Sequence, residues 1–228
     1  MRIGVLGTGM VGRAAAAKLV ELDHQVLVGT REPAATLARE EPHPGYGIPP
    51  FRVWHGQHPG VKLGTFADAA AHGELVVNAI PGAASLDVLR LAGEANLAGK
   101  VLVDIGNALD HSQGMPPSLL VANTDSLGER IQRAFPGTRV VKALNTMTAE
   151  LMVNPQQLAD GDHTVFVCGD DPQAKVVVTG LLTEGFGWRD VVDLGDITTA
   201  RGPEMLLPLW LRLWGALQTP MFNVKVVR

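Results

Sequence analysis

Short apolar runs alternate along the chain with longer segments that mix apolar and polar residues. The runs are rich in Val, Ile and Leu without polar alternation, which is typical of strands covered on both faces of a sheet. An Ala-rich segment predicts a helix at 10–22, and Ser126 followed by Glu129 predicts a capping box that opens a second helix, to Phe135. The predicted strands are residues 3–7, 25–29, 74–80, 100–105, 138–144 and 163–169.

Strands that alternate with helices predict an α/β fold, with a Rossmann-type doubly wound, mainly parallel sheet and a small C-terminal helical or extended segment. We expect residues 1–144 to form a dinucleotide-binding domain. Residues 145–228 are then a small C-terminal extension, which we expect to complete the substrate pocket and to contribute to a dimer contact.

Two segments interrupt this alternation. Residues 41–60 contain five prolines, which restrict φ and remove backbone donors, so we predict an ordered loop or flap rather than a helix or strand. Residues 201–218 are apolar on nearly every face of a predicted helix, which indicates burial or cover by a partner chain, and we expect a homodimer. Trp210 and Trp214 lie one helical turn apart there and are predicted to pack in a core or dimer contact rather than to form a stacking platform.

Composition limits the class of protein. With 228 residues, 46% of them hydrophobic, the chain can bury the core of one large domain or of one domain with a small appendage. A net charge of -4 without any basic tract argues against a nucleic-acid partner. No apolar stretch approaches the roughly 20 residues of a membrane helix, and the N-terminus lacks signal-peptide features, so we expect a cytoplasmic protein with no membrane partner. The single cysteine, Cys168, excludes an internal disulfide and disfavours a cysteine-based zinc site.

The stretch GTGMVG, Gly7–Gly12, follows the first predicted strand and opens the first predicted helix. In that context a G-x-G-x-x-G pattern predicts a dinucleotide-binding turn. Gly7 permits the tight turn, Gly9 lets the backbone approach a pyrophosphate, and Gly12 lets the helix pack closely on the strand. The helix N-terminus then offers free N–H donors to the phosphates. The alternative is a tight strand-to-helix turn that binds no ligand.

The second predicted strand ends on Gly29-Thr30-Arg31, where an NAD-binding fold has a carboxylate for the ribose 2′-hydroxyl. Thr30 can donate its hydroxyl and Arg31 can hold a 2′-phosphate through a charge-assisted fork, so the sequence favours NADP(H). Glu32 follows one residue later, beyond the strand. The alternative is a solvated arginine at a strand end.

Other polar residues favour structural roles, and no metal is expected. His55 and His58 form a close histidine pair in the proline-rich segment, where a polar loop is favoured over a metal site. Asp170-Asp171, followed by proline, favours a helix start over a catalytic or metal-binding pair. Lys142 lies within a predicted strand and is expected to snorkel or pair rather than to catalyse.

With these residues in view, the chain resembles the NADP oxidoreductases that depend on the deazaflavin coenzyme F420, along most of its length. It also looks similar to the cytoplasmic reductase domain of membrane metalloreductases, above all in VVKALNT. The stretches that carry the resemblance are LGTGMVG, VGTR, NAIPG at 78–82, VVKALNT at 140–146, VFVCGDDPQAK at 165–175 and the closing DLGDITTARGPEMLLPL.

The resemblance implies that NADP(H) binds along the strand ends, with a deazaflavin or flavin as second redox partner. Members often have histidine at the position of Asn145 and further basic residues after the arginine, where this chain has EPAA; these departures bear on the electron acceptor. From the residues alone, Asn145 could orient the nicotinamide or a substrate carbonyl, or hold a turn. The implied contacts are Thr8, Gly9, Met10 and Val11 with the pyrophosphate, Thr30 and Arg31 with the 2′-phosphate, Ile80 and Pro81 with the nicotinamide ribose, and Asn145, Thr146 and Met147 with the nicotinamide and the second redox partner.

These observations predict an NADP(H)-dependent oxidoreductase that transfers hydride between NADPH and a small-molecule acceptor of the deazaflavin or flavin type. Such a transfer depends on oriented cofactors more than on acid–base residues, which suits a sequence without a Ser-His-Asp or paired-carboxylate arrangement. Two alternatives stay open: a non-catalytic NADPH-binding sensor or regulatory protein, and a reductase of a small carbonyl or imine. The reductase is ranked lower, because too few residues follow Asn145 for the long helical domain of such enzymes.

Overall fold

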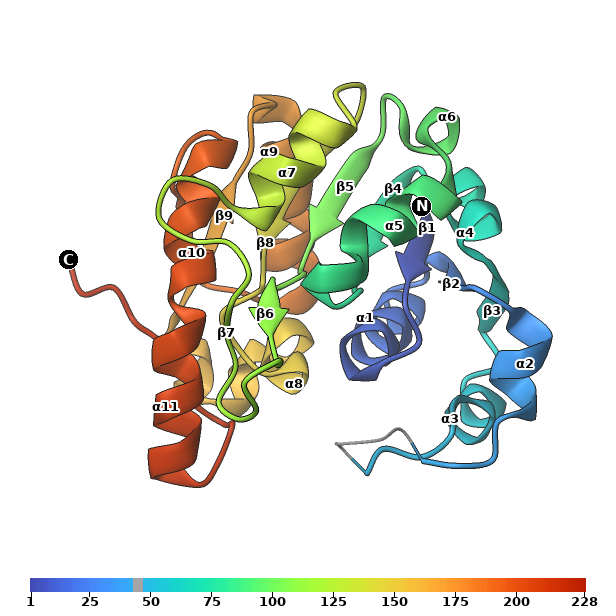
Figure 1. The fold of residues 1–228 in the computed structure, drawn as a ribbon, viewed down its shortest axis with the longest axis horizontal. Helices are drawn as coiled ribbons and strands as arrows, with labels where there is room; N and C mark the ends of the chain where they lie inside the picture. Colours follow the sequence, from blue (N-terminus) through green and yellow to red (C-terminus); the bar gives the residue numbers. More distant parts are fainter. Residues whose placement is uncertain (43–46) are drawn as a thin grey trace.

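One sheet runs through the molecule, with helices on both of its faces (Figure 1). The structure, a computed structural model, describes residues 1–42 and 47–228. Within these residues the sheet has eight strands in the order β10-β9-β8-β5-β4-β1-β2-β3, and β6 and β7 form a separate pair. The bounds are β1 Arg2–Leu6, β2 Gln25–Thr30, β3 Val61–Thr65, β4 Leu75–Asn78, β5 Val101–Asp104, β6 Leu109–Asp110, β7 Ser118–Leu119, β8 Arg139–Ala143, β9 Thr164–Cys168 and β10 Asp190–Asp193.

The strands from β3 to β8 in this order are all parallel. β9 runs antiparallel to β8, and β10 runs parallel to β9. From β1 the chain builds β2 and β3 on one side and then β4, β5 and β8 on the other, which is the order of a Rossmann fold. The predicted fold class is therefore confirmed. Ligands of such sheets bind at the carboxyl ends of the strands where the order reverses, here between β1 and β4.

Helices cover the two faces in separate sets, and each set buries an apolar cluster against the sheet. One face carries α1, α8 and α9, with Leu19, Leu151 and Val178 in its core. The other carries α4, α5 and α7, with Leu89 and Ile131 in its core. The bounds are α1 Met10–Glu21, α2 Pro33–Ala38, α3 Phe51–Gln57, α4 Phe66–His72, α5 Gly82–Ala92, α6 Glu94–Leu97, α7 Leu127–Ala134, α8 Ala149–Val153, α9 Pro172–Gly180, α10 Arg201–Met205 and α11 Leu207–Leu217.

Both predicted helix starts are present, with one difference in detail. Asp171 caps α9, because its Oδ1 accepts the N–H of Ala174 at 2.7 Å. Ser126 caps α7, and its hydroxyl oxygen accepts the N–H of Glu129 at 3.1 Å. The Glu129 carboxylate accepts from the Ser126 hydroxyl at 2.8 Å and from Arg201 at 2.6 Å. The predicted capping box is thus half formed, and its carboxylate links α7 to the C-terminal segment instead.

The prediction that residues 41–60 form no helix or strand is wrong in part. Phe51–Gln57 forms α3 directly after Pro50, and Phe51 is 4% exposed in the core beside α1. Proline is tolerated at a helix start, where its missing N–H has no intrahelical partner to lose. Pro49 and Pro50 therefore lie directly before a helix, and the burial of Phe51 stabilises that helix. The part of the prediction that concerns residues 43–46 lies outside the described residues.

The C-terminal helix α11 is not buried within its own chain. Leu207 is its one buried residue within the described structure, whereas Leu209 and Leu217 are 52% and 53% exposed. Trp210 and Trp214 pack against each other with ring centroids 5.5 Å apart. Burial inside the chain is therefore wrong as an explanation for this apolar segment, and cover by a partner chain stays a prediction. None of the described helices combines the length and apolar character needed to cross a membrane.

Candidate dinucleotide-binding site

The residues predicted to bind the cofactor come together at one edge of the sheet. Gly7 follows β1, Thr30 ends β2, Ile80 follows β4 and Asn145 lies just after β8. These strands are parallel, so their carboxyl ends share one edge, the lower one in Figure 1. Of the other predicted residues, Met10, Arg31 and Pro81 are exposed, Thr8, Gly9 and Val11 are half-buried, and Gly12, Thr146 and Met147 are buried.

The three glycines of the loop differ in what surrounds them. Gly7 adopts a φ of +118°, and a Cβ on it would lie 2.8 Å from the carbonyl oxygen of Ala79. A Cβ on Gly12 would lie 2.1 Å from the carbonyl oxygen of Gly7, so the helix and the strand approach too closely for another residue. A Cβ on Gly9 would meet no protein atom within 4 Å. Gly9 therefore faces open space, which fits a pyrophosphate approaching the backbone.

Helix α1 begins at this loop without a side-chain cap. Gly9 is its N-cap residue, and the first turn contains no acidic side chain. The first N–H groups of a helix lack intrahelical partners, and together with the positive end of the helix dipole they favour an anion. The loop and α1 together fit a bound pyrophosphate.

The end of β2 presents one buried and one exposed side chain. Thr30 is buried, and its Oγ1 lies 2.9 Å from Oγ1 of Thr36 on α2. Arg31 is exposed, so its guanidinium is accessible to an anion. Glu32 is already the N-cap residue of α2. A strand that ends on a hydroxyl and a guanidinium suits a 2′-phosphate better than a ribose hydroxyl alone.

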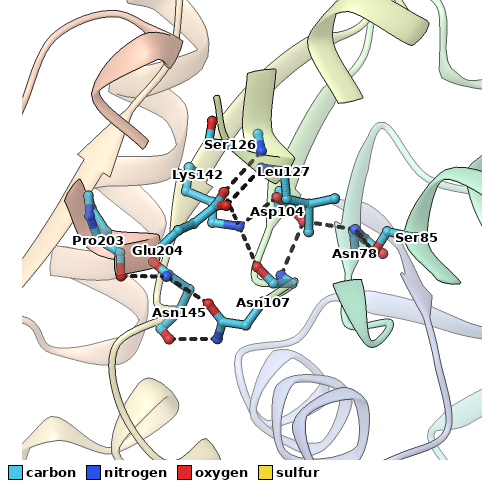
Figure 2. A network of polar contacts seen from close by, with 12 residues as sticks. Asn78, Ser85, Asp104, Asn107, Ser126, Leu127, Lys142, Asn145, Pro203 and Glu204 are labelled. Atoms are coloured by element: carbon cyan, nitrogen blue, oxygen red, sulfur yellow. Dashed lines mark hydrogen bonds and ion pairs between the residues drawn. The ribbon is translucent and has the colours of Figure 1, made fainter. Parts of the chain in front are cut away.

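A row of polar residues crosses the sheet just inside this edge, within the last residues of β4, β5 and β8. Asn78 pairs in register with Asp104, and Asp104 pairs with Lys142. The Nζ of Lys142 donates to Oδ2 of Asp104 at 2.8 Å, and Nδ2 of Asn78 donates to Oδ1 of the same carboxylate at 2.8 Å (Figure 2). Lys142 and Asp104 are completely buried, where an unpaired charge would be costly. The ion pair between Lys142 and Asp104 therefore stabilises each of the two buried charges.

Glu204 of α10 brings the C-terminal segment into this row. Its Oε1 lies 3.0 Å from Nζ of Lys142, and its oxygens accept the N–H groups of Leu127 at 2.7 Å and Gly128 at 3.0 Å (Figure 2). Burial alone would lower the pKa of Lys142, but the attraction of Asp104 and Glu204 outweighs burial and raises that pKa, so the ammonium stays protonated. Two carboxylates and one ammonium leave a net negative charge, which the positive end of the α7 helix dipole stabilises.

The same row holds the turn after β4, where the resemblance places the nicotinamide ribose. Oδ1 of Asn78 accepts the N–H of Ile80 at 3.4 Å, and Nδ2 of Asn78 also donates to Oγ of Ser85 at 3.1 Å. The Ser85 hydroxyl donates to the carbonyl oxygen of Ile80 at 3.4 Å. Asn78 and Ser85 are completely buried. Buried side chains therefore hold both peptide groups of Ile80 before any ligand binds.

Asn145 connects the loops after β5 and β8 to the C-terminal segment. Its Nδ2 donates to Oδ1 of Asn107 at 3.0 Å and to the carbonyl oxygen of Pro203 at 3.1 Å. In return, Nδ2 of Asn107 donates to the carbonyl oxygen of Asn145 at 2.8 Å. Both hydrogens on Nδ2 of Asn145 are thus used inside the protein, which supports the turn-holding alternative. Its Oδ1 is the side-chain atom that can still accept a hydrogen bond from a ligand.

Sequence reasoning missed most of this network, although part of it leaves a signal. The apolar runs of β4, β5 and β8 carry Asn78, Asp104 and Lys142 at or next to their last position. Polar residues at the same place in neighbouring buried strands indicate a shared contact, because buried polar groups require partners. Glu204 leaves no such signal, because its contacts depend on how α10 packs beside α7.

The remaining titratable residues that the sequence singled out have structural partners. Nε2 of His55 lies 2.8 Å from the carbonyl oxygen of Val61, and Nδ1 of His58 lies 2.7 Å from that of Trp54. Within residues 1–42 and 47–228, no three His, Cys, Asp or Glu side chains are grouped so that they could hold a metal ion. Burial raises the pKa of the Cys168 thiol to about 11, which makes it a poor nucleophile at neutral pH.

Known proteins resemble this chain, and one of them does so along its whole length. The family described as NADP oxidoreductase, coenzyme F420-dependent, matches residues 2–108. A crystal structure from Arthrobacter sp. FB24, of a protein named as a candidate F420-dependent NADP reductase, is 60% identical, covers 100% of both chains and has a TM-score of 0.96. The F420-dependent NADP reductase of Methanocaldococcus jannaschii is 29% identical over 220 residues, which are 93% of this chain and 92% of that protein.

Two further relatives share part of their length with this chain. The metalloreductase STEAP3 of Rattus norvegicus is 29% identical over 215 residues, which are 92% of this chain and 38% of that protein. The chain thus spans less than half the length of STEAP3. A reductive aminase of Aspergillus terreus, solved with NADPH, is 19% identical with a TM-score of 0.62 over 95% of this chain and 62% of that one. At that identity the likeness shows the fold alone.

The family match and the two relatives named for F420-dependent NADP reduction show that the chain is an NADP-dependent oxidoreductase. It belongs to the coenzyme F420-dependent NADP oxidoreductase family. The resemblance predicted from the sequence stretches is therefore confirmed.

Replacement of Lys142 tests the importance of the buried charges. Lys142→Met leaves Asp104 and Glu204 buried without their counter-ion, so the free energy of unfolding should fall by about 3–5 kcal/mol. Urea unfolding followed by circular dichroism measures the change. Lys175→Met is a matched control, since Lys175 pairs with the half-exposed Asp193 at 2.9 Å and should contribute about 1 kcal/mol or less. Similar losses for both variants would contradict this interpretation.

Proposed function

We propose that this chain transfers hydride between NADPH and an acceptor of the deazaflavin or flavin type. The observation that carries the proposal is the end of β2, where Thr30 and Arg31 stand in place of a carboxylate, beside a glycine loop that opens onto free space. A guanidinium at this position favours the 2′-phosphate that distinguishes NADPH from NADH. The acceptor is supported by the relatives, one called an F420-dependent NADP reductase and one named as a candidate for that activity.

The chain supplies binding and orientation for this reaction, and bound NADP(H) supplies the hydride chemistry. The N–H groups of the glycine loop and of α1 hold the pyrophosphate. Thr30 and Arg31 hold the 2′-phosphate. Ile80–Pro81 and Asn145–Met147 border the nicotinamide, with Oδ1 of Asn145 as an acceptor that can orient it.

Hydride transfer between stacked rings requires orientation rather than an acid or base from the protein. Charged residues next to the proposed site can provide this orientation. Lys142 forms ion pairs with Asp104 and Glu204, and all three side chains are buried. A satisfied buried network of this kind holds the loops above it in one conformation. The proposed second unit, residues 145–228, contributes Pro203 and Glu204 to the network, which supports our proposal that it completes the pocket.

Turnover with different acceptors tests the proposed reaction. The near-ultraviolet absorbance of NADPH should fall when the chain is mixed with NADPH and either F420 or FMN, and should stay constant without an acceptor. NADPH binding with no turnover for any acceptor would contradict the proposal in favour of a sensor. Turnover with a small ketone or cyclic imine but with neither flavin-type acceptor would contradict it in favour of a carbonyl or imine reductase.

We also propose that a second copy of the chain covers α11. Leu209 and Leu217 are 52% and 53% exposed on this helix, and adjoining exposed apolar side chains are typical of protein–protein contacts. Light scattering should give about twice the 24.2 kDa mass of one chain. Leu209→Arg should shift the mass towards the monomer, because it places a charge in the proposed contact. A wild-type mass equal to one chain would contradict the dimer.

Arg31→Ala tests the preference for NADPH. Loss of the guanidinium should weaken NADPH binding by about 1.5–3 kcal/mol, the usual contribution of a hydrogen bond to a charged group, and leave NADH binding nearly unchanged. Titration calorimetry with both nucleotides measures the difference. Arg39→Ala, at the exposed C-terminal end of α2, is the matched control and should change neither affinity. Equal losses for NADPH and NADH in Arg31→Ala would contradict a 2′-phosphate contact.

A further inference from the structure

The side chain of Arg13 turns back from α1 onto the glycine loop. Arg13 is 8% exposed, and its Nε donates to the carbonyl oxygen of Thr8 at 2.9 Å. Its own N–H donates to the carbonyl oxygen of Gly9 at 3.0 Å. That second bond is the first i to i−4 backbone bond of α1, so the arginine side chain itself holds the carbonyl of Thr8, in the loop that faces the proposed pyrophosphate.

The same guanidinium also contacts the described part of the proline-rich segment, residues 41–60. Nη1 of Arg13 donates to the carbonyl oxygen of Pro49 at 2.6 Å, and its central carbon lies 5.4 Å from the centre of the Phe51 ring. We call residues 47–57 the α3 segment. Phe51 anchors this segment in the core that also contains Leu19 of α1. Arg13 thus connects the glycine loop to an anchored part of the chain outside the glycine motif.

Burial makes this arginine costly unless its donors are used. Burial lowers the pKa of the Arg13 guanidinium, and within the described residues no carboxylate forms an ion pair with it. Two carbonyl oxygens and one aromatic face offset the cost of burying the charge. A planar fork that donates in two directions at once is a geometry that lysine cannot reproduce.

The contact with Thr8 has a consequence for the next donor of the loop. A trans peptide is planar, so the carbonyl of Thr8 and the N–H of Gly9 point in opposite directions. When Arg13 holds that carbonyl on its own side, the N–H of Gly9 is directed away from Arg13. Gly9 is also the residue whose Cβ would meet open space. The donor is therefore set before a ligand arrives, which lowers the ordering cost of binding.

We propose that Arg13 is a positioning residue that couples the α3 segment to the Thr8–Gly9 peptide and so presets the glycine loop for the pyrophosphate of NADP(H). The inference rests on the proposed function and deepens it, because it makes the α3 segment part of the cofactor site. It also separates two roles at the adenosine end. Arg31 selects the 2′-phosphate, whereas Arg13 acts on the pyrophosphate that NADPH and NADH share.

Binding of three nucleotides to Arg13→Met tests this role. NADPH and NADH should both bind roughly tenfold more weakly, with the ratio of their affinities unchanged. Adenosine 2′-monophosphate has no pyrophosphate, so its affinity should stay at the wild-type value. A general distortion of the site would weaken all three nucleotides, and that result would overturn the proposal, as would wild-type affinity for NADPH. If the wild-type chain itself bound no NADPH, the proposed function would fall as well.

Further variants separate geometry from charge. Arg13→Lys keeps the charge but not the fork, so NADPH binding should stay several-fold weaker than in the wild type; full rescue would contradict positioning by the fork. Phe51→Leu should weaken NADPH binding in the same direction, and should add little to Arg13→Met in the double variant, because the two residues act through one contact. Additive losses would contradict that coupling. Arg90→Met is the matched control and should leave NADPH binding unchanged, since Arg90 is exposed on α5 and pairs with Asp87 at 2.7 Å.

Discussion

The ammonium of Lys142 joins parts of the chain that are far apart in the sequence. It lies 2.8 Å from Asp104 on β5 and 3.0 Å from Glu204 on α10, and all three groups are buried. Asp104 also accepts a hydrogen bond from Asn78 on β4, and Glu204 accepts the first N–H groups of α7. The sheet, α7 and the C-terminal segment therefore share one set of charges. None of them can shift alone without leaving a buried charge unpaired, which is strongly unfavourable.

These bonds fix the conformation of the strand ends at which the predicted cofactor contacts lie. Asn78 reaches from the buried row to the Ile80 turn, and Asn145 ties the end of β8 to Pro203 beside Glu204. Charges inside the sheet hold the neutral loops at the strand ends in place, which is the arrangement that orientation of two rings requires. The opposite end of the edge depends on arginines instead. In our proposal, that end recognises phosphates through charge and aimed donors, whereas the nicotinamide end recognises shape.

Periodicity and the glycine motif predicted six of the eight strands in the described sheet, α1 and the strand ends at which the site residues gather, whereas β3 and β10 were not predicted. They could do so because strand burial and a tight glycine turn are local properties. The buried row escaped prediction, since the alignment of Asn78, Asp104 and Lys142 depends on strand register. Glu204 escaped because its partners come from distant segments. The helix that begins at Phe51 was not predicted, because the prolines before it are locally typical of a loop.

A crystal structure of the chain with NADP+ tests the central claim most directly. We predict the 2′-phosphate beside Thr30 and Arg31, the pyrophosphate against Gly9 and the first turn of α1, and the nicotinamide between Ile80 and Asn145. The buried row and the Arg13 contacts should keep the conformation described above, because they are formed without the cofactor. A dinucleotide bound in the reverse direction, or away from this edge, would contradict the account.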